Sequence, residues 1–216
     1  MKKYEFTGEV KRIKWIGTEV VLRRIRAVTA FGVVKAGDIG GWIEKEENLS
    51  HDGSAWVYGD AWVHGNARVH GDAWVYSDAK VYGDAGVYGN AEVYGNAKVC
   101  GNAKVCGNAE VYGNAEVYGN ARVHGDARVC GGAEVYSVNH IFSIGPVGSR
   151  NEYTTFYRNK NEKIEVRCGC FNGRIEEFLE KVAETHGENK HASVYRAAAE
   201  IAKLQIEPLS TDEEAE

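Results

Sequence analysis

The stretch from Gly53 to Tyr136 reads GSAWVY GDAWVH GNARVH GDAWVY SDAKVY GDAGVY GNAEVY GNAKVC GNAKVC GNAEVY GNAEVY GNARVH GDARVC GGAEVY. It holds fourteen consecutive hexads without an insertion and covers 84 of the 216 residues. Alanine takes the third place and valine the fifth in every hexad, and glycine opens all but the one beginning at Ser77. A six-residue repeat of this fidelity predicts a parallel β-helix, with one short strand and one corner per hexad.

The alternation of side chains along a strand predicts which places of the hexad are buried. Alanine and valine are two places apart, so they point the same way and form the core. The residue between them varies freely and is expected to face solvent. Three hexads per coil give an interior narrow enough for these side chains, and residues eighteen apart then stack. Glycine with Asn or Asp suits the corners, where positive φ is needed.

The rest of the chain is divided by changes in composition. We predict four segments: a small N-terminal β cap at 1–40, the hexapeptide-repeat β-helix at 41–136, a C-terminal α+β module at 137–206 and an acidic flexible tail at 207–216. In the cap, strands are expected at 4–14 and 18–27 and a third within 30–41. The hexad frame extends backwards to residue 41, with Ile43 and Leu49 in the place of alanine.

The C-terminal module combines strand and helix patterns. A strand is expected around 141–144, and a hairpin follows with its turn at 159–162. Residues 171–187 predict an amphipathic helix with Asn172 as N-cap and Gly187 as its stop. A second helix is expected at 191–206, and its inward residues are expected to be Val194, Ala198, Ile201 and Leu204.

Composition limits the surroundings and partners of the chain. The formal net charge is −5 and no apolar run could cross a membrane, so neither nucleic acid nor a membrane is expected as a partner. The five cysteines form no convincing disulfide pattern. We expect free thiols and a cytoplasmic location, which is the bacterial host cytoplasm if the chain is phage-encoded.

Aromatic residues gather at the start of the repeat. Stacking by eighteen places Trp56 directly beside Trp74, with Trp62 around the corner. These three tryptophans either stabilise the fold or form a contact surface for another subunit or a partner. A homo-oligomer, either a trimer or a dimer, is expected.

The hexads resemble the hexapeptide-repeat left-handed β-helix family, which is known best from acyltransferases. The regular GNA-x-V-Y form is similar to acetyltransferase-like and polymer-forming proteins of bacteria and prophages. The resemblance implies a left-handed helix and, in the enzymes, acetyl-CoA bound between subunits with a histidine as general base. His64, His70 and His124 are the catalytic candidates on that interpretation. All three share a corner place with tyrosine and cysteine, and no loop interrupts the hexads, so the sequence favours a protein without catalysis, cofactor or metal.

The C-terminal module carries residues suited to binding an anion. A glycine-rich turn at 145–151 and a presumed helix N-terminus after 168–173 both offer backbone N–H groups. The candidate ligand-binding residues are Ser149, Arg150, Thr154, Thr155, Asn172 and Gly173. Tight turns that serve only packing are the alternative.

Three classes of function remain open from the sequence. The first is a non-catalytic binding or scaffold protein, in which the β-helix displays a C-terminal module that binds a small anionic, nucleotide-like ligand or a protein partner. Phage-borne ligand sequestration or counter-defence would belong to this class. The second is a CoA-dependent acyltransferase, and the third is a structural, polymer-forming protein.

Overall fold

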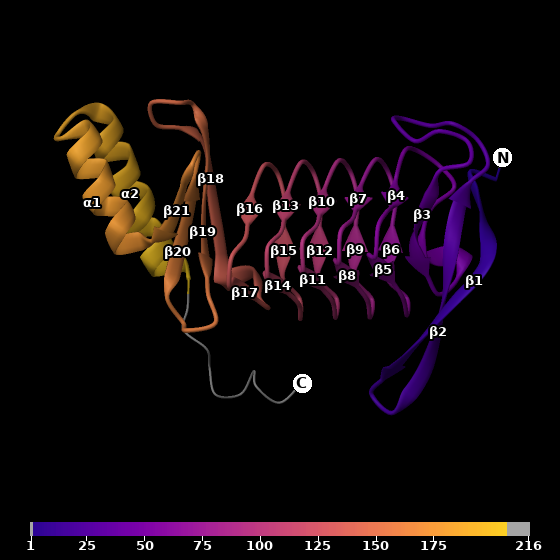
Figure 1. The fold of residues 1–216 in the computed structure, drawn as a ribbon. Coiled ribbons are helices and arrows are strands. Elements are labelled where there is room, and N and C mark those ends of the chain that lie inside the picture. Colours follow the sequence, from indigo (N-terminus) through magenta and orange to yellow (C-terminus); the bar gives the residue numbers. More distant parts are fainter. Residues whose placement is uncertain (1, 207–216) are drawn as a thin grey trace.

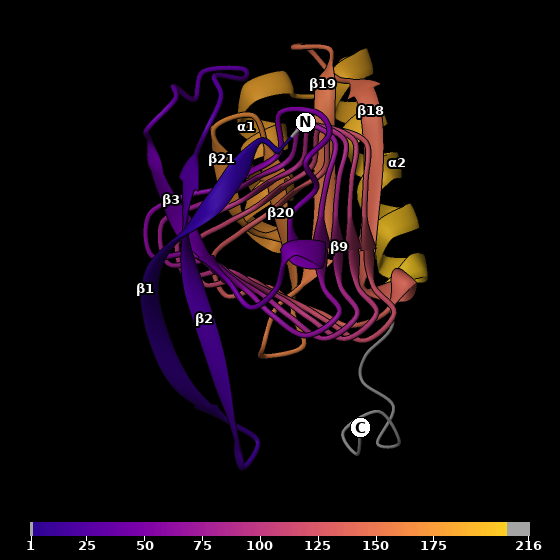
Figure 2. The ribbon, with the colours of Figure 1, turned by 90° about the vertical axis from the view of Figure 1, so that its right-hand side faces the viewer.

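The computed structural model describes residues 2–206 and shows a β-solenoid between two smaller regions. An antiparallel β region precedes the solenoid, and a β-sheet with two helices follows it (Figure 1). The solenoid has about five turns, and Figure 2 shows its coils superimposed as seen along the axis. The predicted parallel β-helix is confirmed. The predicted acidic tail at 207–216 lies outside the described residues.

Each of the fourteen hexads contributes one two-residue strand. These strands are β4 (Trp56–Val57), β5 (Trp62–Val63), β6 (Arg68–Val69), β7 (Trp74–Val75), β8 (Lys80–Val81), β9 (Gly86–Val87), β10 (Glu92–Val93), β11 (Lys98–Val99), β12 (Lys104–Val105), β13 (Glu110–Val111), β14 (Glu116–Val117), β15 (Arg122–Val123), β16 (Arg128–Val129) and β17 (Glu134–Val135). Every third strand joins the same parallel sheet, and partners such as Val93 and Val111 are eighteen residues apart. The prediction of three hexads per coil is therefore correct.

The interior of the solenoid is built from the two invariant places of the hexad. Every alanine and valine of the fourteen hexads is at most 1% exposed. The corner residues stack outside this core, as in Tyr76, Tyr94 and Tyr112, whose successive ring centroids are 4.9 Å apart. The five cysteines are free, as predicted.

The glycines of the corners are required by both conformation and space. Gly107 has a φ of +75°, and a Cβ atom there would lie 2.9 Å from the backbone nitrogen and oxygen of Gly125 in the next coil. Ser77 takes the same place with a φ of 60°. Left-handed φ strains a residue that has a Cβ atom, so Ser77 is a local weak point.

The N-terminal region extends one solenoid sheet. β1 (Tyr4–Trp15) and β2 (Thr18–Ala27) form a hairpin, and β3 (Ile39–Ile43) joins β2 to β5 in the order β1-β2-β3-β5-β8-β11-β14-β17. The third cap strand thus lies later than the predicted 30–41. The region also covers the first coil, since Tyr4 and Ile25 belong to the same core as Trp56.

The backward extension of the hexad frame was wrong by two residues. Ile43 pairs with Val63 and Leu49 with Val69, so both occupy the place of valine rather than that of alanine. The spacing is twenty residues there, against eighteen from Trp56 to Trp74. Two extra residues, His51 and Asp52, therefore precede the first regular hexad. The short 3-10 helix Glu46–Asn48 lies just before them.

The C-terminal module is a four-stranded antiparallel sheet packed against two helices. Its elements are the 3-10 helix Val138–His140, β18 (Ile141–Val147), β19 (Glu152–Arg158), β20 (Ile164–Cys168), β21 (Phe171–Arg174), α1 (Ile175–His186) and α2 (Lys190–Gln205). A second core joins the sheet to the helices through residues such as Phe156 and Phe178. The predicted hairpin and the stop at Gly187 are correct.

Two details of the predicted helices are wrong. Asn172 lies in β21 opposite Arg167, and the N-cap of α1 is Arg174. In α2 the small residues face the core together with Tyr195, whereas Ile201 and Leu204 are 46% and 86% exposed. The helix packs closely through alanines, so its larger apolar side chains turn outward.

A buried cation marks the junction between solenoid and module. Arg158 is 1% exposed, and its guanidinium lies 4.4 Å from the ring centroid of Tyr136. His140 is 2% exposed in the same region. Burial, together with the positive charge of Arg158, lowers the pKa of His140 to about 4.

Candidate functional site

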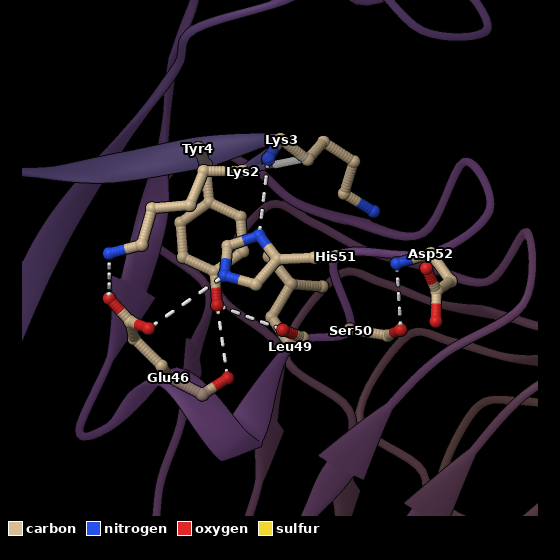
Figure 3. A network of polar contacts seen from close by, with 8 residues as sticks. All are labelled: Lys2, Lys3, Tyr4, Glu46, Leu49, Ser50, His51 and Asp52. Atoms are coloured by element: carbon tan, nitrogen blue, oxygen red, sulfur yellow. Dashed lines mark hydrogen bonds and ion pairs between the residues drawn. The ribbon is translucent and has the colours of Figure 1, made fainter.

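The two residues that interrupt the hexad frame, His51 and Asp52, create an irregular loop at the start of the solenoid. Figure 3 shows that the N-terminal strand holds this loop through Tyr4 and His51, whose rings stack with centroids 4.3 Å apart. The Tyr4 hydroxyl lies 2.8 Å from the carbonyl oxygen of Leu49 and 3.0 Å from that of Glu46. Burial raises the pKa of Tyr4, so the hydroxyl remains a donor.

Nδ1 of His51 is held by a hydrogen bond, and Nε2 is buried without a hydrogen-bond partner in the described structure. Nδ1 accepts the backbone N–H of Lys3 at 3.2 Å, which places the proton of the neutral ring on Nε2. Nε2 is buried 3.9 Å from the carboxylate of Glu46, which also pairs with Lys2 at 2.7 Å (Figure 3). The Lys2 contact lowers the pKa of Glu46. His51 therefore orients the loop and does not present a free basic nitrogen.

Lys3 fastens the other side of the loop. Its ammonium group donates to the carbonyl oxygens of Gly53 at 3.2 Å and Ala55 at 2.9 Å. Burial lowers the pKa of Lys3 to about 8, although the charges of Asp52 and Asp72 oppose this shift. The loop is thus tied to the first strand by side chains on both sides.

The loop forms one wall of an open pocket of about 620 Å³. The loop adjoins β6, since Leu49 pairs with Val69, and the pocket is also lined by Arg68 of β6 and by His70 at the following corner. The remaining lining residues are Glu46, Glu47, Leu49, Ser50, His51, Asp52 and Val69.

A second hollow of about 510 Å³ adjoins the first, because Arg68 and His70 line both. It lies where Gly86 leaves the face without a side chain, one coil below Arg68 and one above Lys104. The stacked rings of His70 and Tyr88, with centroids 5.0 Å apart, form one edge. Asn66 and Asp84 also line the hollow. The two hollows together form a groove along this face, which we call the β9 groove.

The face that carries the β9 groove is basic. Its outward residues are Arg68, Gly86, Lys104 and Arg122, in register down the sheet. Among the described residues none of these three cations has an ion-pair partner. The other two faces differ, since Lys98 pairs with Glu116 at 2.6 Å and Arg128 with Glu110 at 3.1 Å. Unpaired arginine and lysine in a hollow suit phosphate or carboxylate groups.

The three candidate histidines lie in different surroundings. His64 is 5% exposed and stacks against both Trp62 and Tyr82. Burial lowers the pKa of His64, and it cannot act on a ligand from that position. His70 is exposed and lines the β9 groove. His124 lines a separate hollow of about 240 Å³ near the C-terminal module.

Two of the three tryptophans predicted as a contact surface are covered by the chain itself. Trp56 is 1% exposed beneath Phe31 and Tyr4, and Trp62 is 6% exposed beneath Trp15. The N-terminal region supplies these rings, which the repeat alone could not indicate. Only Trp74 of the three remains partly exposed.

The residues predicted to bind an anion in the C-terminal module are dispersed. Ser149 and Arg150 lie in the β18–β19 turn, whereas Thr154 and Thr155 are buried neighbours on β19 and face opposite sides of the sheet. Asn172 accepts a hydrogen bond from the Tyr157 hydroxyl at 3.1 Å, and Gly173 pairs with Val166 in the sheet.

The presumed anion site at a helix N-terminus is occupied by the chain. The carboxylate of Glu177 accepts the backbone N–H of Arg174 at 3.2 Å, and Glu176 adds a second negative charge in the first turn of α1. An anion would be repelled there. Of the six candidates, Thr155 lines a hollow of about 320 Å³ at the junction, which is also lined by Arg128 and Arg167.

Metal ligands do not gather in the described part of the chain. No group of three or more His, Cys, Asp or Glu side chains there could hold a metal ion. No helix within residues 2–206 has the length and apolar character needed to cross a membrane.

The fold and the repeat define a β-solenoid protein, and comparison with known proteins specifies the type of repeat. Residues 115–131 match the family model described as "YdcK Beta solenoid repeat". Over 62 residues the chain is 39% identical to a protein of Escherichia coli (strain K12) named "Uncharacterized acetyltransferase YdcK". That match covers 27% of this chain and 19% of the relative, so the chain spans about a fifth of that relative's length. The chain is thus a β-solenoid protein with a stretch of repeat similar to that of YdcK.

Sequence reasoning missed the β9 groove, although part of its signal was present. Gly86 is the only glycine in the variable fourth place of the hexads; Arg68 lies eighteen residues before it, and Lys104 and Arg122 lie eighteen and thirty-six residues after it. The loop containing His51 could not be located, because an imperfect hexad hides a two-residue shift.

Proposed function

We propose that this protein is a non-catalytic binding protein whose β9 groove takes a phosphorylated small molecule. The observation that carries the proposal is the row of unpaired cations around the hollow at Gly86. Arg68 and Lys104 are two coils apart, which is roughly 10 Å at the spacing of adjacent strands. A ligand with two anionic groups, such as a nucleotide with two phosphates, matches that separation.

The rigid solenoid suits such a role. Arg68 and Lys104 project from strands whose core places are filled by alanine and valine, so the backbone that carries these two cations is fixed before a ligand arrives. The anion-binding role that the sequence suggested for the C-terminal module is better supported on this face, where Arg68 and Lys104 line the hollow at Gly86 and neither forms an ion pair within the described residues, although Asp84 also lines it. The C-terminal sheet then closes the opposite end of the solenoid and is available for a protein partner.

Binding is tested by isothermal titration with CoA, ATP, a cyclic dinucleotide and inorganic phosphate. Gly86→Leu should fill the hollow without unfolding the chain, since a Cβ atom at Gly86 meets only the Tyr88 ring at 3.6 Å. We expect Gly86→Leu and Lys104→Gln each to weaken binding by about tenfold or more, which equals roughly 1.4 kcal/mol. Lys98→Gln on another face is the matched control.

Two results would contradict the proposal. Equal losses in Lys104→Gln and Lys98→Gln would show a general charge effect rather than a site. Full retention of binding in Gly86→Leu would place the ligand elsewhere on the molecule.

A second candidate function is CoA-dependent acetyl transfer, favoured by the similarity to the E. coli protein named as an acetyltransferase. CoA carries phosphates, so the same basic face would hold it, and exposed His70 beside the groove would be the general base. His51 is unsuited because its Nδ1 already accepts the backbone N–H of Lys3 and its Nε2 is buried. Turnover of acetyl-CoA with an amine acceptor, lost in His70→Ala, would support this function over binding alone.

The third class of function, a structural, polymer-forming protein, is tested by measuring the oligomeric state. We propose self-association of the chain into a dimer or trimer, because a rigid prism with flat faces offers extended surfaces for it. Multi-angle light scattering over a range of concentrations distinguishes a closed oligomer from an open polymer. A monomer at every concentration would reject both self-association and the polymer-forming function.

A further inference from the structure

A second face of the solenoid carries an aromatic pocket that the proposed groove does not use. The pocket has a volume of about 350 Å³ and is lined by Val33, Tyr58, Trp74, Tyr76 and Glu92. It belongs to the face of the sheet formed by β4, β7, β10, β13 and β16, around a corner from the β9 groove. Three aromatic rings and one carboxylate thus surround one hollow.

The pocket exists because Tyr58 departs from the corner stack. Tyr76 stacks on Tyr94 with centroids 4.9 Å apart, and the series continues to Tyr112 at the same spacing. Tyr58 occupies the equivalent corner one coil earlier but is 53% exposed and has no ring contact with Tyr76 in the described structure. The ring of Tyr76 is consequently left open toward Tyr58.

Glu92 supplies a negative charge at the base of the pocket. It lies directly beside Trp74 in the parallel register and accepts a hydrogen bond from the Tyr76 hydroxyl at 2.8 Å. Glu110, the next carboxylate on this face, is neutralised by Arg128 at 3.1 Å. Glu92 has no ion-pair partner among residues 2–206, so a cation is the group missing from this site.

The combination of rings and an unpaired carboxylate selects one kind of cation. A metal ion would need several oxygen or nitrogen ligands, and only one carboxylate is present. A quaternary ammonium group carries no N–H donor to satisfy and is stabilised by the faces of tryptophan and tyrosine rings. We propose that the pocket formed by Tyr58, Trp74, Tyr76 and Glu92 binds a quaternary ammonium group.

The test compares choline with its neutral isostere 3,3-dimethylbutan-1-ol by isothermal titration of the full chain. Choline should bind saturably and about tenfold or more tightly than the isostere, because only choline carries the charge. Trp74→Leu and Glu92→Gln should each weaken choline binding by about tenfold, and Gln at 92 can still accept the Tyr76 hydrogen bond. Glu134→Gln, an outward carboxylate of another sheet, is the control and should bind choline normally.

Three outcomes would overturn the proposal. The first is absence of choline binding, and the second is equal binding of choline and the isostere, which indicates a merely apolar hollow. The third is equal loss in Glu92→Gln and Glu134→Gln. Where choline binds, comparison of choline with a peptide that contains N-trimethyllysine distinguishes a free small molecule from a methylated protein as the source of the group. Since Gly86→Leu should leave choline binding intact, failure here is separable from failure of the β9 groove.

Discussion

The guanidinium of Arg158 lies over the ring of Tyr136, with 4.4 Å between the guanidinium carbon and the ring centroid. This contact joins the last hexad of the solenoid to strand β19 of the C-terminal sheet. None of the three guanidinium nitrogens has a hydrogen-bond partner within the described residues. The aromatic ring is therefore the principal compensation for a charge that is 1% exposed, and a second positive charge nearby would be costly.

We predict that acid weakens this junction through His140. Its native pKa of about 4 lies below the ordinary value of 6.5, so the unfolded chain binds the proton first as the pH falls. The free energy of unfolding should therefore decrease between about pH 6.5 and pH 4, by on the order of 2 to 3 kcal/mol. Urea denaturation at pH 7.5 and 4.5 measures the loss. A His140→Asn variant should lose less over the same interval, and identical losses in both proteins would contradict the prediction.

The corner glycines should be intolerant of a single methyl group. Gly107→Ala places a Cβ atom 2.9 Å from the backbone of Gly125 and at a positive φ, so we expect a loss of about 1 to 3 kcal/mol in the free energy of unfolding. Gly132→Ala is the control, because no heavy atom lies within 4 Å of its Cβ position. Thermal denaturation compares the two, and similar melting temperatures would show that the coils can move apart without cost.

Replacement of Ser77 by glycine, in contrast, should stabilise the chain. Ser77 adopts a φ of 60° at a corner place held by glycine in the other thirteen hexads. Ser77→Gly relieves the left-handed strain and should raise the free energy of unfolding by up to about 1 kcal/mol, reduced by the greater freedom of glycine in the unfolded chain. Ser77→Ala retains the Cβ atom and should give no such gain. A lower melting temperature for Ser77→Gly would mean that the Ser77 side chain contributes more than its strain costs.

The tryptophans of the first coils should differ in their contribution to stability. Trp56 is 1% exposed beneath Phe31 and Tyr4, so Trp56→Ala should cost about 3 to 5 kcal/mol. Trp74 is only partly buried, and Trp74→Ala should cost less than half as much. Urea denaturation of the two variants measures both values. Equal costs would indicate that the N-terminal region does not cover Trp56 in solution.

The regular part of this fold follows directly from its sequence. Invariant alanine and valine at a spacing of two define the inward face, and the period of six sets the three-sided coil, so the register of partners such as Val93 and Val111 could be predicted. The burial of a residue could not be predicted from the repeat where a segment outside the repeat covers it. Trp56 occupies an outward place of its hexad, yet a ring from a segment more than twenty residues earlier covers it.

Local patterns were least reliable at the boundaries. The sequence from Phe171 to Arg174 is compatible with the start of a helix or with the last strand of a sheet. In the structure it pairs with β20 and forms strand β21. Ile43 and Leu49 are apolar in either frame, so periodicity alone did not reveal that they pair twenty residues ahead. The β9 groove depends on the lack of a side chain at Gly86. A single glycine in a variable place of the hexad does not predict a hollow unless the residues of the neighbouring coils are considered with it.

The eighteen-residue spacing between stacked partners makes the solenoid a molecular spacer. Each coil pairs only with the coils before and after it, so duplicating the three hexads from Gly89 to Cys106 would add one rung of roughly 5 Å. The packing of the N-terminal hairpin and of the C-terminal sheet would stay the same, while the distance between them grew. Duplication of whole coils can therefore lengthen the separation between the two ends of this protein in fixed steps. Each added coil would repeat contacts that the solenoid already contains.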